Sequence, residues 1–500
     1  MTDQTEEQGQ LRARTPIKMA VPATPGAVRR FILTSAQNNT ELHRPLWENL
    51  KAYAAHVDAE IIVATFTYSK RTTSAKGAKR KTAKETDLAD EWWVPEIKHH
   101  TRDERVLLAP GLMWCGELQI LPTAENPLAG LESYTGRASS IIPHTKFAVQ
   151  SIPSPKNAGT KFLYTTGTVT LRNYIQKKAG QKAEFHHGYG AVIAEVDTGG
   201  NWFVRQLCAD SEGTFYDFDC KAEDGKVTTG HRPEALVWGD IHERQLEDWM
   251  HDLCWGAGGI LDTLHPKRQV MHDLVDFRSQ NHHDKDDSWK TFAKHCTGKL
   301  NVEEEIEEAA KFLLRADRSW CETAIACSNH DMAFVRWLKE ADFREDPENA
   351  LYFLKASLAV YRDLSRETAF GFYVLQWAFD DWLTRAGENW PGDVRFLRRD
   401  ESYVVCPDAS GGIELGMHGD VGVNGARTLN IRTFARTGRK CIIGHSHSAG
   451  AFEGAWQVGV TGSLDQGYNQ GMSSWSHTNA LVYPNGKRTL FTIWNRKWRA

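Results

Sequence analysis

The segment EALVWGDIH, residues 234–242, is an apolar run that ends in Gly239-Asp240-Ile241-His242. The apolar run predicts a buried strand, and its polar end predicts a loop at the tip of that strand. Asp240 and His242 share one face of an extended segment because strand side chains alternate with period two. A carboxylate and an imidazole on one face are typical metal ligands. Taken alone, the segment fits either a metal site at the end of a strand or an ordinary polar loop.

Four further polar clusters follow along the second half of the chain, and most stand where an apolar run ends. They are His272-Asp273-Leu274-Val275-Asp276, Asn329-His330-Asp331, Met417-His418-Gly419-Asp420 and Gly444-His445-Ser446-His447. Carboxylate, imidazole and amide donors without cysteine suit Mn²⁺, Fe²⁺ or Zn²⁺ and argue against a structural zinc knot. Each cluster alone is a common chance match, whereas the ordered set is not. The donors outnumber those that one ion needs, so we expect two ions that share a carboxylate.

As an ordered set, the clusters resemble the calcineurin-like metallophosphoesterase superfamily, whose pattern is D-x-H, GD-x-x-D, GNH[DE], a lone H and GH-x-H. The resemblance covers residues 234–465 and implies a two-sheet β-sandwich flanked by helices, with the ligands on loops at strand ends. It implies two divalent ions, Mn²⁺ first, with Mg²⁺, Fe²⁺ or Zn²⁺ as alternatives. One ion would be held by Asp240, His242, Asp273 and His447, and the other by Asp273, Asn329, His418 and His445.

The resemblance also implies a mechanism in which a hydroxide between the two ions attacks phosphorus in line. His330, oriented by Asp276, would be the catalytic histidine that assists the leaving oxygen. Two positions depart from the pattern, since His272 and Ser328 stand where the family has glycines that permit tight turns. An arginine directly after Asp276 is also missing, which disfavours a protein phosphatase.

Basic and aromatic segments make DNA the expected substrate. Residues 70–84, KRTTSAKGAKRKTAK, hold no acid and would neutralise DNA phosphates, with a solvated charge run as the alternative. The contacts would come from Lys70, Arg71, Lys76, Lys79, Arg80, Lys81 and Lys84. Lys487-Arg488 and the segment 496–499 mix basic and aromatic residues as single-strand binders do, or form an ordinary hairpin and tail.

Two other functions remain open at this point. One is a phosphomonoesterase or cyclic-nucleotide phosphodiesterase, and the other is a non-catalytic scaffold that binds nucleic acid, against which the intact donor set argues. The layout, an N-terminal α/β region before a phosphoesterase with a helical insertion, further resembles the pre-early DNA-degradation and DNA-transfer proteins of large virulent siphophages. That resemblance implies a DNase acting in the cytoplasm of an infected bacterium.

The composition is compatible with this assignment. The 500 residues carry 60 Lys and Arg against 64 Asp and Glu, a net charge of −4, which excludes a polycation and an acidic disordered chain. No apolar run approaches the ~20 residues of a membrane span, and the first 19 residues lack the apolar stretch expected of a signal peptide. The nine cysteines are scattered and never spaced as CxxC, which fits a reducing cytoplasm.

The predicted fold class is α/β (α+β), with helical and strand patterns in both halves. We expect a disordered arm at 1–27, an α/β region at 28–230, a metallophosphoesterase domain at 231–480 and a hairpin and tail at 481–500. A helical insertion is predicted at about 342–391, where aromatic side chains at helical spacing would pack between helices. The N-terminal region would position substrate or form a homo-oligomer.

Overall fold

The structure is a computed structural model that describes residues 18–19, 27–68, 91–281, 284, 287–366, 373–409, 411–427 and 430–500. The basic loop at 70–84, with all seven predicted DNA contacts, lies outside these ranges, and so does most of the predicted arm. Within the described ranges, no helix is long and apolar enough to cross a membrane.

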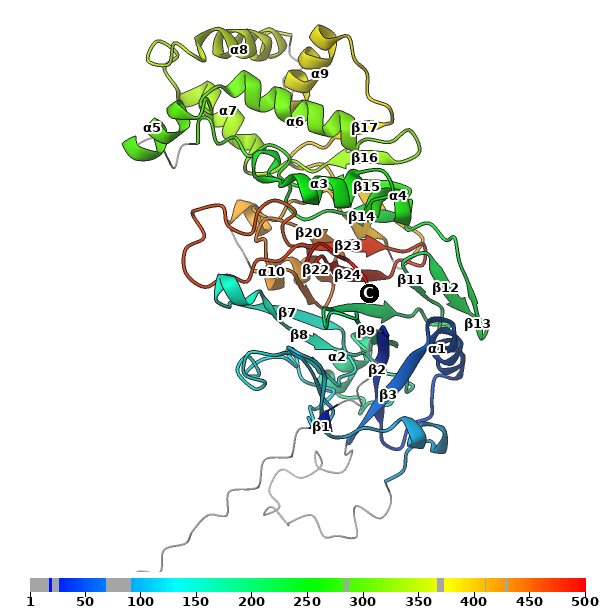
Figure 1. Cartoon of the computed structure of the whole chain (residues 1–500). Coiled ribbons are helices and arrows are strands. Elements are labelled where there is room, and N and C mark those ends of the chain that lie inside the picture. The colour runs from blue at the N-terminus through cyan, green and yellow to red at the C-terminus, as the bar shows by residue number, and fades with distance from the viewer. Residues whose placement is uncertain are drawn as a thin grey trace, which may run out of the picture.

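A six-stranded sheet forms the middle of the molecule (Figure 1). Its order is β17-β16-β15-β14-β23-β24; the first four strands are parallel, and β23 and β24 form an antiparallel hairpin. This antiparallel pair is the hairpin predicted near the C-terminus. The bounds are β14 Ala235–Val237, β15 Arg268–Met271, β16 Glu322–Ile325, β17 Val394–Phe396, β23 Thr478–Val482 and β24 Arg488–Thr492.

Helices cover the outer face of this sheet (Figure 1). They carry the aromatic residues predicted to pack between helices, and Tyr352, Phe379 and Trp382 are buried there. This burial confirms the packing role of those side chains. The helices are α3 Asp248–Trp255, α4 Ile260–Leu264, α5 Ser288–Cys296, α6 Val302–Ala316, α7 Asp331–Glu340, α8 Ala350–Leu364 and α9 Val374–Ala386, with the 3-10 turn η4 Glu243–Gln245.

An 11-stranded sheet combines strands from both sides of residue 230, because β7 pairs with β21. Its order is β1-β4-β5-β6-β8-β7-β21-β22-β20-β19-β18. The bounds are β1 Lys18–Met19, β4 Arg105–Ala109, β5 Leu112–Cys115, β6 Ser139–Ile142, β7 Ala148–Ile152, β8 Lys161–Thr165, β18 Val404–Val405, β19 Ile413–Glu414, β20 Cys441–Ile443, β21 Gly450–Phe452 and β22 Ala455–Gln457. Shorter elements beside it are α2 Lys178–Phe185, α10 Ile431–Ala435, η3 Lys156–Ala158 and η5 Val423–Gly425.

A four-stranded sheet, β10-β9-β2-β3, lies at the N-terminal end with α1 packed on it. The α/β region predicted from residue 28 begins with a strand, a helix and a strand, namely β2, α1 and β3. The edge strand β10 lies beside β24, where the backbone N–H of Leu490 donates to Gln206 Oε1 at 2.9 Å. The bounds are β2 Arg29–Gln37, α1 Arg44–Val57, β3 Ala59–Phe66, η2 Pro95–His100, β9 Gly190–Val196 and β10 Trp202–Cys208, followed by the three-stranded sheet β11 Phe215–Asp217, β12 Cys220–Glu223 and β13 Lys226–Thr228.

One apolar core joins the sheets. It contains Val237 and Val270 of the six-stranded sheet, Ile442 and Trp456 of the 11-stranded sheet, and Val192 of the four-stranded sheet. The fold is therefore a mixed α/β arrangement of stacked sheets, with helices on the outer face of one of them. This stacking brings the loops after β14, β15 and β16 together with the loops after β19 and β20.

Candidate metal centre

The predicted ligands lie on loops at the carboxyl ends of strands. Asp240 and His242 follow β14, Asp273 follows β15, Asn329 follows β16, and the remaining ligands, His418, His445 and His447, follow β19 and β20. Loops at the carboxyl ends of adjacent parallel strands share one edge of the sheet, where ligands commonly bind. The structure therefore gathers side chains that are more than 200 residues apart in the sequence.

Four of the predicted ligands form one buried group. Asp240, His242, Asp273 and His447 each offer a donor atom, and these atoms lie within 4.8 Å of one another. His447 Nε2 lies 3.1 Å from Asp240 Oδ2, and His242 Nε2 lies 3.7 Å from Asp273 Oδ2. All four side chains are almost completely removed from solvent. This is the set that the resemblance to metallophosphoesterases assigned to the first ion.

The donor chemistry of this group fits a divalent cation. Asp240 Oδ1 and Asp273 Oδ1 are buried and accept no hydrogen bond from any described residue. His242 Nε2 and His447 Nε2 face each other at 3.0 Å, although two ring nitrogens can share at most one hydrogen bond along that line. Buried, unpartnered carboxylate oxygens are costly unless they are paired or coordinate a metal. A cation bound by one donor atom of each of the four side chains would neutralise both carboxylates.

A second set of predicted ligands lies directly beside the first. His418 Nε2 is 3.3 Å from Asp273 Oδ2 and 3.1 Å from Asn329 Oδ1. The ring of His445 packs edge-on against His418, with 5.2 Å between the ring centroids. Asp273 thus faces donors of both sets, which is the position expected of a bridging carboxylate.

The backbone around these donors is held in rarely adopted conformations. His242, Asp273, His445 and His447 all have positive φ, between 46° and 72°. Residues other than glycine seldom adopt a positive φ. Those that do cluster at functional sites, where the surrounding fold imposes this backbone conformation. Position 444 must be glycine because its backbone lies close to Asp240: a Cβ there would lie 2.2 Å from Asp240 Oδ1.

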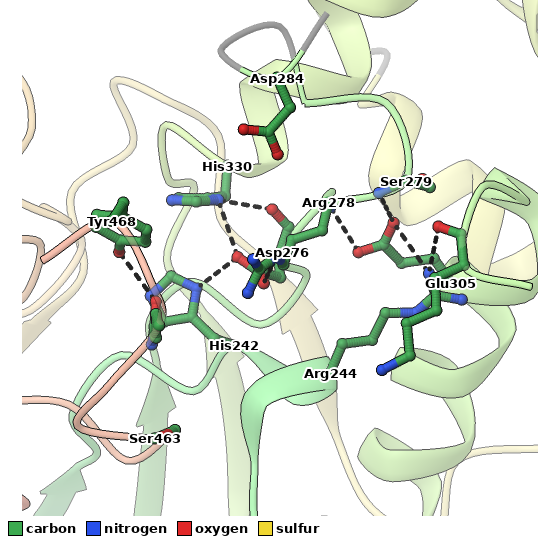
Figure 2. A network of polar contacts seen from close by, with 12 residues as sticks. His242, Arg244, Asp276, Arg278, Ser279, Asp284, Glu305, His330, Ser463 and Tyr468 are labelled. Carbon is green, nitrogen blue, oxygen red and sulfur yellow. Dashed lines mark hydrogen bonds and ion pairs between the residues drawn. The ribbon is translucent and has the colours of Figure 1, made fainter. Parts of the chain in front are cut away.

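His330 and Asp276 form a polar network next to the first set (Figure 2). His330 Nδ1 lies 2.7 Å from the main-chain oxygen of Asp276 and 3.6 Å from its Oδ1. The Asp276 carboxylate itself lies closer to His242, with 3.2 Å between Oδ1 and Nδ1. Asp276 therefore orients two histidines: His242 through its side chain and His330 mainly through its carbonyl group.

Glu305 supports this network, although no sequence pattern singled it out (Figure 2). Its carboxylate is buried within α6 and accepts the backbone N–H groups of Arg278 at 2.8 Å and Ser279 at 2.9 Å. Burial raises the pKa of Glu305, and nearby Arg244 opposes that effect. The side chain fixes the loop that carries Asp276. The acidic stretch VEEEIEE, residues 302–308, gives no signal of such a role, because the other four glutamates in it are at least partly exposed.

His272 and Ser328, the two positions that depart from the metallophosphoesterase pattern, lie in different surroundings. His272 is fully buried, its Nδ1 lies 3.4 Å from His418 Nδ1, and burial lowers its pKa to about 4. The backbone N–H of Ser328 donates to Asp331 Oδ2 at 2.9 Å, and Tyr373 donates to the same oxygen at 3.1 Å. Asp331 therefore fixes the turn that presents Asn329 and His330. Burial raises the pKa of Asp331 to about 6.

The charged groups of the centre compensate one another. Burial would raise the pKa of Asp273, but His418 and His330 hold it well below its usual range. Burial would lower the pKa of His418, but the Asp273 carboxylate raises it to about 9. Protons on histidine thus neutralise the buried carboxylates when no cation does so.

Metal binding should therefore release protons, which gives a first prediction. His418, with its pKa near 9, is protonated at pH 7 and must become neutral before its nitrogen can bind a metal. We expect Mn²⁺ affinity to rise with pH between 7 and 9 and then to level off. Calorimetric titrations at pH 7 in buffers of different ionisation enthalpy measure the proton count directly. The H418Q variant should release fewer protons, and an equal count in both proteins would refute the assignment of His418.

The basic and aromatic residues at the C-terminus have divided roles. Trp498 is buried against Phe218, with 4.8 Å between the ring centroids, and Lys497 pairs with Asp197 at 2.7 Å. These two therefore stabilise the fold. Arg496 instead lies over the ring of Trp249 at 5.3 Å and lines a cavity of about 450 Å³.

Comparison with known proteins gives one informative match. The chain is 36% identical over 484 residues to "Protein A1" of Escherichia phage T5, and the alignment covers 94% of this chain and 83% of that protein. No protein-family model matches the chain, and no solved structure is significantly similar to it.

Proposed function

The chain belongs to the same protein family as protein A1 of Escherichia phage T5, and we propose that it is a phage-encoded, metal-dependent phosphodiesterase that cleaves DNA. One observation carries the proposal: two carboxylates and two imidazoles, all buried, converge within 4.8 Å, and several of their polar atoms have no hydrogen-bond partner among the described residues. A phage protein of this kind would act in the cytoplasm of the bacterial host.

Two bound ions would lower the pKa of a water molecule between them and neutralise the phosphoryl oxygens. Asp240, His242, Asp273 and His447 would hold one ion, while Asn329, His418 and His445 would join Asp273 around the other. Mn²⁺ suits this mixture of carboxylate, imidazole and amide donors best, with Mg²⁺, Fe²⁺ and Zn²⁺ as alternatives.

His330 is the group best placed to handle the leaving oxygen. Its Nδ1 is held by the carbonyl of Asp276, and its ring centroid lies 4.8 Å from that of the ligand His242. The Nε2 atom is then the one that exchanges a proton with substrate. Asp276 fixes the orientation of this ring and of His242, so both residues keep their geometry during turnover.

An aromatic cavity beside the centre supports a polynucleotide substrate. Trp475 packs edge-on against His447, with 4.1 Å between the ring centroids, and lines the cavity of about 450 Å³ together with Trp249, Trp494 and Arg496. Aromatic rings next to a cation bind unpaired bases by stacking, whatever the base. A base adjoining the cleaved phosphate would therefore find a stacking surface there.

Substrate preference tests the proposal. Purified protein with Mn²⁺ is offered circular and linear duplex DNA, single strands, p-nitrophenyl phosphate and cyclic AMP. We expect cleavage of DNA and no turnover with EDTA. Turnover of the small esters alone would replace the nuclease by a phosphomonoesterase or cyclic-nucleotide phosphodiesterase. DNA binding that is insensitive to EDTA, without any turnover, would replace it by a scaffold.

A further inference from the structure

A second cavity, of about 960 Å³, lies at the other end of β20 from the metal centre. Lys440 lines it and directly precedes β20, whereas His445 and His447 follow that strand. Its other walls come from the start of β7, from α2, from the turn between β21 and β22, and from the start of β24. The cavity is therefore separate from the candidate metal centre and contains none of its residues.

Three cations in this cavity have no acidic partner within the part of the chain that the structure describes. Among the described residues, Lys440, Lys487 and Arg488 form no ion pair. Arg488 is only 7% exposed and donates to two main-chain oxygens, those of Cys441 and Gly454, each at 2.9 Å. Burying a guanidinium beside two ammonium groups is unfavourable unless an anion neutralises them.

The lowered pKa values of Lys440 and Arg488 also indicate that this cluster lacks a counter-ion among the residues that the structure describes. Burial lowers the pKa of Lys440, and the positive charges of Lys487 and Arg488 lower it further. Burial also lowers the pKa of Arg488 to about 10. Lys487 and Arg488 therefore disfavour the charged form of Lys440 in the absence of a counter-ion.

The acids of the cavity lie against side chains other than these three cations, although Glu453 Oε1 accepts no hydrogen bond from any described residue. Glu453 lies 3.3 Å from His186 Nε2 and 4.0 Å from Lys182, and Glu125 lies 3.4 Å from Lys182. Glu184 accepts from Gln176 at 2.9 Å. The lining holds six Lys and Arg against three Glu, an excess of three positive charges. The acids thus leave the cation cluster available to a ligand.

Aromatic rings complete the cavity wall. Phe147, Tyr189, Phe452 and Trp456 line it, and the guanidinium of Arg488 lies 4.8 Å from the centre of the Trp456 ring. Arg172 lies over Tyr189 at 5.4 Å. Flat apolar surfaces beside clustered cations match a ligand with a planar base and a phosphate. A volume of about 960 Å³ is also within the usual ~300–1,000 Å³ of small-molecule sites.

We propose that this cavity is a binding site for a nucleoside phosphate, with Lys440, Lys487 and Arg488 holding the phosphate and the aromatic wall holding the base. The ligand is a free nucleotide, because the cations lie at the far end of β20 from the centre at which a strand would be cut. The site does not depend on metal-centre activity.

Calorimetry with EDTA present separates this site from the metal centre. The probes are dAMP, inorganic phosphate and a single-stranded 12-mer, and the proteins are the unmodified chain, the K440Q/K487Q variant and the control K98Q/K226Q. Lys98 and Lys226 are exposed and lie outside the cavity. We expect dAMP to bind with about 1:1 stoichiometry, more tightly than phosphate, and at least tenfold more weakly to K440Q/K487Q than to the control.

Several results would overturn the proposal. Absence of dAMP binding, or equal dAMP affinity in K440Q/K487Q and the control, would exclude the site. Phosphate binding as tight as that of dAMP would exclude a role for the aromatic wall, and binding of the 12-mer alone would exclude a free nucleotide. If K440Q/K487Q has a lower melting temperature than the control, dAMP affinity is compared for the single variant K487Q instead. Lys487 is only half-buried, so replacing it should disturb the fold less.

Discussion

Replacing Asp273 with asparagine is expected to abolish metal-dependent DNA cleavage, with kcat/KM falling by at least about 10³-fold, or ~4 kcal/mol. Asp273 lies 3.7 Å from His242 Nε2 and 3.3 Å from His418 Nε2, so its carboxylate faces both sets of donors. The amide keeps the shape of the side chain but loses its negative charge. Initial rates of duplex cleavage at saturating Mn²⁺ measure the effect.

A matched control separates this effect from a general loss of carboxylate charge. Asp262 pairs with Arg318 at 3.0 Å, on α4 and away from the centre, so D262N should retain nearly full activity. Circular dichroism and thermal melting show whether D273N is folded. A folded D273N protein that cleaves DNA at the unmodified rate would show that Asp273 does not hold a catalytic metal.

Replacing His330 with alanine is expected to lower kcat by about 10²–10⁴-fold while leaving metal binding intact. His330 contacts Asp276 and packs against His242. It lies outside the group of four that would hold the first ion, and its donor atom lies within 4.8 Å of those of His242 and Asp276, so its role must be tested against that of a ligand. An acid that protonates the leaving oxygen matters most when that oxygen is basic. The loss should therefore be large for DNA and much smaller for bis(p-nitrophenyl) phosphate, whose leaving group needs no proton.

The comparison between the two substrates identifies the role of His330. A structural role would lower the rates on DNA and on the activated ester by the same factor, and equal losses would refute proton transfer by this residue. Mn²⁺ affinity, measured by calorimetry on H330A, serves as the control for the metal site. A marked loss of affinity would make His330 a ligand instead.

Much of the candidate site can be predicted from the sequence, because the ends of strands and the types of metal-donor side chain are local features. EALVWGDIH already places Asp240 and His242 at the end of a buried strand, and the structure gathers that pair with Asp273 and His447. The C-terminal hairpin is equally local, since Asn485-Gly486 sets its turn. What the sequence could not supply is the contact between distant segments.

Glu305 and the 11-stranded sheet illustrate that limit. Glu305 is one of several glutamates in α6, and only tertiary packing shows that its carboxylate binds the backbone of Arg278 and Ser279. The pairing of β7 with β21 joins residues some 300 positions apart, for which no short pattern exists. The need for glycine at position 444 is likewise clear only from the structure, where an added Cβ would lie 2.2 Å from Asp240 Oδ1.

Part of the cation cluster could be found in the sequence, but not the cavity that its residues share. Lys487-Arg488 stood out in the sequence as a basic pair near aromatic residues. The structure places Arg488 against Trp456 and brings Lys440 from a separate segment to the same cavity. Whether such residues face solvent or a cavity depends on the sheet register, which the sequence alone does not determine.

The metal content of the purified protein bears on the whole account. The chain is stripped with EDTA, loaded with Mn²⁺, dialysed and analysed by inductively coupled plasma mass spectrometry, next to D273N. We expect about two Mn²⁺ per unmodified chain and a marked loss of bound metal in D273N. A folded, unmodified chain that retains no more Mn²⁺ than D273N would contradict the assignment of the buried His/Asp cluster as a metal centre.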